Sequence, residues 1–258
     1  MSVEQEVRRA SNHPVVTYGA RVGYAASGVL HLLLGWLALR LAWGSYGGEA
    51  DQAGAFETLR GSGAGLVLLV VLAIGFVLLG LWNLIEAALT REGAGTRVKH
   101  VAKGLTYAAM TFGALSVVAG NDESSAGQSR DLTARLLSSG AGVAVVVVIG
   151  VVVLGVGGYH VYKGVAKKYH DDLRENPGRV VEVLATVGYV AKGVALVVVG
   201  GLFMAAALTH DPEKASGMDG ALRTLMGVPW GQALVTLVAV GLVAYGLYSF
   251  ARAKYARV

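Results

Sequence analysis

Six long apolar runs constrain this chain most strongly. Each is long enough to cross a hydrocarbon core of about 30 Å as a helix, and with 54% hydrophobic and 15% charged residues the 258-residue chain is too apolar for an ordinary soluble domain. The predicted spans are Arg21–Trp43, Gly65–Leu89, Val98–Ala119, Gly142–Val165, Val183–Leu208 and Gly231–Ala253. Because lipid leaves no partner for unpaired backbone groups, we expect helices even in valine-rich runs. The fold class is therefore an all-α integral membrane helical bundle.

The charges of the loops predict which side of the membrane each loop faces. The N-terminus, the two loops that follow the second and fourth spans, and the C-terminus carry 16 Lys or Arg and 8 acids, a net charge of +8. The opposite side carries 6 bases and 9 acids, a net charge of −3. Lys and Arg concentrate on cytoplasmic loops, so we expect both termini in the cytoplasm and the protein in the bacterial inner (plasma) membrane. Residues 1–20 form a retained cytoplasmic segment. Nucleic acid is not expected as a partner, since the charge follows the loops.

Three tandem copies of a two-helix unit make up the chain. The copies open with Arg21-Val-Gly-Tyr-Ala-Ala-Ser-Gly28, Arg97-Val-Lys-His-Val-Ala-Lys-Gly104 and Thr186-Val-Gly-Tyr-Val-Ala-Lys-Gly193. We place the repeats at residues 21–90, 97–167 and 183–255. Glycines at matching positions permit close packing of membrane helices. The helix-packing positions predicted on this basis are Gly28, Gly35, Gly104, Gly193 and Gly200 in the odd helices and Gly80, Gly157 and Gly246 in the even ones.

A short segment with its own apolar pattern precedes each even helix. These segments are Ala55–Arg60, Asp131–Leu137 and Ala221–Met226. Such segments suit short helices lying at the outer membrane surface, and plain loops containing leucines are the alternative. Two spans per repeat return the chain to the same side, so the repeats share one orientation. We therefore expect a pseudo-threefold arrangement about the membrane normal, with the odd helices near the axis and the even ones at the lipid-facing periphery.

The repeated residues resemble an actinobacterial membrane family catalogued as domain-of-unknown-function family 1206. The likeness covers nearly the whole chain and is clearest from Gly188-Tyr-Val-Ala-Lys-Gly193 through Gly220-Ala-Leu-Arg-Thr-Leu-Met226 to Pro229-Trp-Gly231. The second copy departs from it, with Lys99-His100 in place of Gly-Tyr. The resemblance implies a six-helix bacterial inner-membrane protein and no assigned biochemistry.

Polar residues inside the spans are candidate sites because they are costly in lipid. His31 lies about 15 Å from the start of the first span, and the other repeats hold Tyr107 and Leu196 at its position. It is either a proton carrier or ligand, or a structural histidine between helices. Further candidates, for polar contacts or lipid headgroups near the cytoplasmic ends of the helices, are Asn83, Glu86, Lys103, His160, Lys163 and Lys192.

Several kinds of chemistry find no support in the sequence. There are no cysteines, and no span carries a His-x-x-x-His or Glu-x-x-His pattern, so no metal, haem or other cofactor is expected. We expect a non-catalytic scaffold, accessory or lipid-binding protein, with membrane lipids, anionic headgroups, a membrane protein or a second copy as partners. The alternative is a small transporter or proton channel that uses His31. The four prolines lie outside the spans, which disfavours broken transport helices. A third option is an intramembrane enzyme or redox protein using His31 with Tyr107.

Overall fold

The computed structural model describes residues 14–44, 47–90, 93–121, 125–174 and 177–255, with helical side chains described from residue 21 onwards. In this part of the chain there are helices and no strands, and six helices are long and apolar enough to cross a membrane. These six are α2 (Pro14–Ala42), α4 (Gly63–Leu89), α5 (Ala94–Val118), α7 (Gly140–Val165), α8 (Arg179–Thr209) and α10 (Gly231–Tyr255). The predicted all-helical, six-span fold class is confirmed.

The chain divides into two compact units. One consists of Met1–Ala55 with Glu123–Val258, and the other of Phe56–Asp122. The first contains the helices α2, α7, α8 and α10, whereas the second contains the pair α4 and α5. Each unit therefore has its own helix packing.

The three predicted short segments are helical. They belong to α3 (Gln52–Arg60), α6 (Ser125–Leu137) and α9 (Gly217–Met226), and two short 3-10 helices, η1 (Lys168–Asp172) and η2 (Pro212–Lys214), lie beside α8. Their position at the membrane surface stays a prediction. The turn into each even helix requires a glycine, because a Cβ at Gly65, Gly142 or Gly231 would collide with the carbonyl oxygen of the leucine six residues earlier. The repeated glycines are thus explained by this tight turn.

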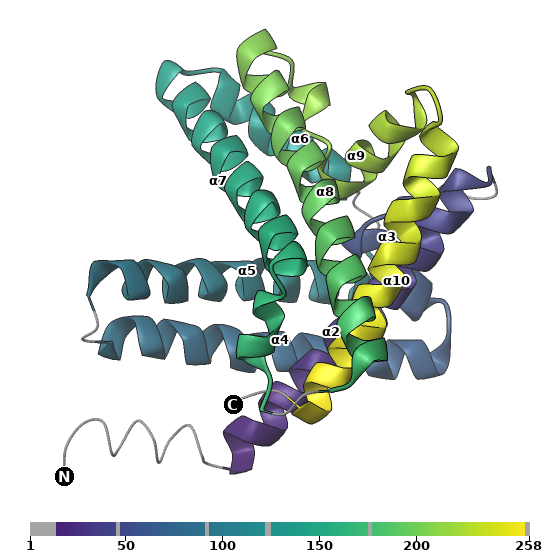
Figure 1. The fold of residues 1–258 in the computed structure, drawn as a ribbon. Helices are drawn as coiled ribbons and strands as arrows, with labels where there is room; N and C mark the ends of the chain where they lie inside the picture. Colours follow the sequence, from purple (N-terminus) through teal and green to yellow (C-terminus); the bar gives the residue numbers. More distant parts are fainter. Residues whose placement is uncertain (1–13, 45–46, 91–92, 122–124, 175–176, 256–258) are drawn as a thin grey trace. The chain divides into compact units, whose positions relative to one another are not determined.

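Long helices pair across the repeat boundaries. The pairs are α4 with α5, α7 with α8, and α10 with α2, and the last two pairs can be followed in Figure 1. In each pair the even helix of one repeat packs on the odd helix of the next, and the last helix of the chain packs on the first. This pairing order is cyclic. The pseudo-threefold arrangement of the three repeats stays a prediction.

The helix-packing glycines lie where the paired helices cross. A Cβ on Gly157 would lie 2.9 Å from the carbonyl oxygen of Gly193, and one on Gly246 would lie 2.9 Å from that of Gly28. The equivalent approach in the α4–α5 pair is looser, at 3.7 Å from Gly80 to the oxygen of Gly104. Further along the α2–α10 and α7–α8 pairs, Cβ atoms on Gly35 and Gly200 would lie 2.8 and 3.0 Å from the carbonyl oxygens of Ala239 and Gly150.

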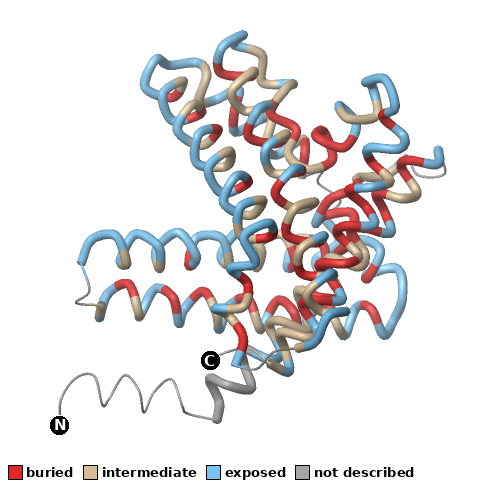
Figure 2. The backbone as a smooth tube through the Cα atoms, in the orientation of Figure 1, coloured by how far each residue is buried: buried red, intermediate tan, exposed pale blue. Residues whose placement is uncertain are grey.

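The last helix is the most buried of the six. Within its most apolar stretch 56% of α10 is buried, against 17–33% for the other spans, and Figure 2 shows buried residues along α10. It packs on α8 as well as on α2. The missing side chains of Gly241 on α10 and Gly188 on α8 leave room for Ala191 and for the backbone of Tyr245, respectively. The expectation that even helices lie at the lipid-facing periphery is therefore wrong for α10.

A polar junction joins parts of all three repeats at the end of this unit where α2 stops. Asp219 of α9 accepts from the backbone N–H of Ala50 at 2.9 Å, and Arg223 donates to the same carboxylate at 2.7 Å. Glu49 accepts from the backbone N–H of Ala126 in α6 at 3.4 Å. Asp51 is buried and caps α3 by accepting from Ala53 and Gly54. These contacts hold the loop before α3 against α6 and α9.

Candidate functional site

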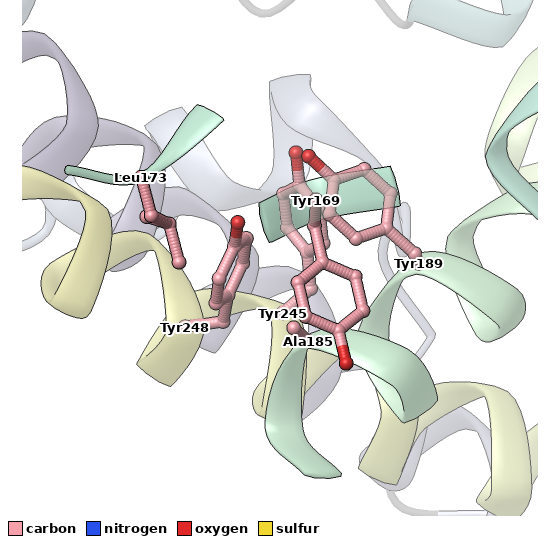
Figure 3. Packing of buried hydrophobic residues seen from close by; sticks show 6 residues of the cluster. All are labelled: Tyr169, Leu173, Ala185, Tyr189, Tyr245 and Tyr248. Atoms are coloured by element: carbon pink, nitrogen blue, oxygen red, sulfur yellow. The ribbon is translucent and has the colours of Figure 1, made fainter. Parts of the chain in front are cut away.

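A cluster of tyrosines fills the opposite end of the same unit. Tyr169 of η1, Tyr189 of α8, and Tyr245 and Tyr248 of α10 pack together with Leu173 and Ala185, and we call this group the tyrosine cluster (Figure 3). The Tyr189 and Tyr245 rings meet edge to face with centroids 5.2 Å apart, an arrangement that aromatic quadrupoles favour. Tyr169 is fixed by hydrogen bonds, since its hydroxyl donates to the carbonyl of Glu182 at 3.1 Å.

Two cations share one carboxylate beside the tyrosine cluster. Lys163 Nζ lies 2.6 Å and Arg252 Nη2 3.5 Å from Asp172 Oδ2, and Tyr189 Oη lies 3.4 Å from the same oxygen. The three charged side chains are 14%, 16% and 25% exposed. The group therefore holds an excess of one positive charge in a partly desolvated place, where charge interactions are strong.

Arg252 also anchors the first span. Its guanidinium lies 4.3 Å from the ring centroid of Tyr24 on α2 and donates to the tyrosine hydroxyl at 3.1 Å. Arg252 Nε is also buried and has no hydrogen-bond partner among the described residues. A buried donor without an acceptor is unfavourable, so this place suits an additional acceptor.

His31 and Lys192 meet deeper in the unit. Lys192 Nζ lies 3.1 Å from His31 Nε2, and His31 Nδ1 lies 2.7 Å from the carbonyl oxygen of Ser27. The carbonyl can only accept, so Nδ1 carries the hydrogen and Nε2 accepts from Lys192. Both side chains pack on Tyr245, whose ring centroid lies 4.6 Å from that of His31 and 4.3 Å from Lys192 Nζ.

Lys192 lies well inside α8. It comes 13 residues after Arg179, the first residue of α8. At 1.5 Å per residue this is about 20 Å along the helix. The position of Lys192 relative to the membrane surface stays a prediction.

Other predicted candidates make matching contacts in the other helix pairs. Asn83 Oδ1 on α4 lies 3.4 Å from His100 Nδ1 on α5, and the His160 ring on α7 lies 5.7 Å from that of Tyr189 on α8. His100, Tyr189 and Tyr24 occupy one repeat position. The residue at this repeat position therefore makes a polar contact in every helix pair.

The remaining candidates belong to the unit that contains α4 and α5. In the α4–α5 unit Glu86 is half-buried, Lys103 is exposed, and Tyr107 stacks on Phe76 with ring centroids 6.3 Å apart. Sequence reasoning missed Asp172, which lies outside the repeat pattern, whereas Arg252 occupies the same repeat position as Glu86 and Lys163. The recurring Gly-Tyr pair was the signal that could have found Tyr24 and Tyr189.

Exposed aromatic side chains lie at both ends of the unit that contains α2, α7, α8 and α10, and exposed lysines accompany them at one end. Tyr159 and Tyr162 are exposed near the end of α7, followed by exposed Lys167 and Lys168. Trp43 and Trp230 are exposed at the other end, Trp230 by 85%. Such aromatic residues are enriched at membrane–water interfaces. The Asp172 group lies at the same end of the unit as Tyr159 and Tyr162. Among the described residues, no group of three or more potential metal ligands occurs.

Comparisons with known proteins agree with the repeat pattern. The model of the family described as Domain of Unknown Function (DUF1206) matches residues 22–90, 98–167 and 187–256. An uncharacterized protein of Bacillus subtilis, YxxB, is 27% identical over 94% of this chain and 92% of its own length. No solved structure gives a significant match. With three matches covering most of its length, the chain belongs to the DUF1206 family of unknown function and is a multi-pass membrane protein with an internal threefold repeat.

Proposed function

We propose that this protein is a non-catalytic accessory or scaffold protein of the bacterial plasma membrane that binds anionic lipid headgroups at the Asp172 group. The observation that carries the proposal is the pairing of two partly exposed cations with one carboxylate, which leaves one positive charge in excess. A phosphate oxygen is an acceptor and carries the missing negative charge. The lysines exposed around this end would add attraction to an anionic leaflet.

Native mass spectrometry of the purified protein tests lipid binding. We expect phosphatidylglycerol to remain bound in preference to phosphatidylcholine, and a Lys163→Gln/Arg252→Gln double variant to lose that preference. Lys214→Gln, which removes a half-exposed cation at the other end, is the control and should keep it. Equal retention of both lipids by the wild-type protein would contradict the proposal.

We further propose that both termini lie in the cytoplasm, as the loop charges indicate. Single cysteines introduced into this cysteine-free chain at the exposed positions Gln52 and Ser138 should react with an impermeant maleimide in intact cells. Cysteines at Gly95 and Asp171, also exposed in the structure, should react only after lysis. The opposite labelling pattern would reverse the orientation.

Proton transport is a second candidate, favoured by the contact between His31 and Lys192 near the middle of their helices. Intramembrane ionisable pairs commonly mark ion pathways. Proteoliposomes containing the protein should then acidify faster than empty liposomes under a potential, and His31→Gln should remove the difference. Equal acidification rates with and without the protein would exclude proton transport and leave the non-catalytic lipid-binding role.

A further inference from the structure

Lys192, His31 and Ser27 have the relative positions of a nucleophile, a base and the group that orients the base. The amine lies within hydrogen-bond distance of Nε2, at 3.1 Å, and Nδ1–H is held by the Ser27 carbonyl at 2.7 Å. The carbonyl fixes the tautomer in which Nε2 is free to take a proton. This chain of contacts is how proteins prepare weak nucleophiles for attack.

The amine lies among aromatic and apolar side chains, with the Tyr245 hydroxyl and His160 as its further polar neighbours. Tyr245 covers Lys192 and His31 together, and one helical turn further along α2 and α10 the buried side chains are Leu34 and Leu242. Among the described residues no carboxylate contacts Lys192, since Asp172 is held by Lys163 and Arg252. An ammonium at this depth is costly. Lys192 itself is only half-buried, so an apolar reagent can approach it.

We propose that Lys192 is an activated amine that binds a membrane-soluble aldehyde covalently as an imine. His31 Nε2 takes one proton from the ammonium, and the freed nitrogen attacks the carbonyl carbon to form a C–N bond. One proton of the attacking nitrogen and the proton held by His31 then pass to the former carbonyl oxygen, the C–O bond breaks, and water leaves. The product is a protonated imine, His31 is neutral again, and no oxidant or reductant is consumed. This activity is independent of lipid binding at the Asp172 group.

The chain contains its own control for this chemistry. Lys103 occupies the same repeat position as Lys192 but lies on α5. At the repeat position of His31 the second copy has Tyr107 and the third has Leu196, so neither of these copies supplies a histidine there. Lys103 is exposed, whereas Lys192 is half-buried. If accessibility alone decided the reaction, Lys103 would react faster. Activation by His31 predicts the reverse order.

Reductive trapping measures that order directly. The full-length protein in mild detergent is incubated with hexadecanal and cyanoborohydride, and the alkylated lysines are quantified by peptide mass spectrometry. We expect the Lys192 adduct to exceed the Lys103 adduct by at least about tenfold, a threshold below the roughly 100-fold or more that a positioned base typically contributes. Glycolaldehyde, a polar aldehyde, should instead react mainly with exposed lysines.

Substitution of the base gives the second readout. His31→Gln should reduce the Lys192 adduct by about tenfold or more and leave the Lys103 adduct unchanged. Equal labelling of Lys192 and Lys103 in the wild-type protein would overturn the proposal without any variant having to fold. Unchanged Lys192 labelling in a monodisperse His31→Gln protein would also overturn it.

Discussion

The α7–α8 pair and the α4–α5 pair follow the same repeat pattern but pack differently. Both have glycine at the crossing, yet Gly157 and Gly193 bring the backbones into contact, whereas Gly80 and Gly104 stand further apart. The residue facing the odd-helix glycine explains this, because it is the short Val161 in one pair and the longer Leu84 in the other. A repeated glycine therefore permits a close crossing, and the neighbouring side chain decides whether it forms.

The polar contacts of the two pairs differ in the same direction. The α7–α8 end carries the Asp172 group with its two cations, while in the α4–α5 pair Asn83 lies 3.4 Å from His100 without a carboxylate in that contact. The unit that contains α7 and α8 should therefore respond more strongly to loss of a polar side chain.

The largest effect is expected for Asp172→Asn. Removing the shared charge leaves Lys163 and Arg252 without a carboxylate partner. Breaking a buried ion pair costs about 3–5 kcal/mol, and with the side chains 14–25% exposed we expect about 2–3 kcal/mol. The measurement is thermal unfolding in detergent. Asp171→Asn, at the exposed neighbouring position, is the control, and an equal loss in both variants would show that Asp172 has no special role.

Gly157→Ala should have the next largest effect. Its Cβ would lie 2.8 Å from the backbone nitrogen of Val197, and forced overpacking costs about 1–3 kcal/mol. Gly80→Ala is the matched substitution in the other pair. There the nearest atom is 3.5 Å away, so the better helix propensity of alanine makes the change neutral or stabilising by up to about 1 kcal/mol. Equal melting temperatures for the two variants would remove the distinction between the crossings.

A smaller, pH-dependent effect is expected at the loop junction. Burial, followed by the nearby Glu49, raises the pKa of Asp51 to about 7. The folded state therefore holds this proton more tightly than the unfolded state, and the resulting stability is present below the usual carboxyl pKa and lost as the pH rises through 7. Asp51→Asn, which keeps the acceptor oxygen for the α3 cap, should flatten the fall in melting temperature between pH 5 and pH 8. The exposed Glu57→Gln should leave that fall unchanged.

Sequence patterns predicted the elements of this fold better than their contacts. The apolar runs located all six spans, because helix formation in lipid depends on local composition. The ends agree to within about four residues, except that α2 begins at Pro14, seven residues before the predicted start at Arg21. The internal repeat predicted the glycines at the helix crossings, because each of them recurs at a fixed offset in the repeats. Nothing in the pattern indicated that α10 is the most buried helix, since its contacts with α2 join residues more than 200 positions apart.

The residues of the candidate site also divide into those that the repeat pattern predicted and those that it did not. The repeat-related members, among them His160 and Lys163, could be found by aligning the repeats, whereas Asp172 lies in a connecting segment without an equivalent. The contact between His31 and Lys192 joins residues 161 positions apart. His31 stood out because only the first repeat has a histidine there, but its partner depended on how far α8 extends.

Cross-linking of the first and last spans tests the central claim, that the repeats pair cyclically, most directly. Cysteines replacing Tyr24 and Arg252, whose side chains meet at 3.1 Å, should be joined by a short bismaleimide within one chain, as detected by mass spectrometry of the linked peptides. A Tyr24→Cys/Leu247→Cys protein, with the second cysteine at an exposed position of α10, should link far less. Equal linking of the two pairs, or no link between residues 24 and 252, would contradict the packing of the last helix on the first.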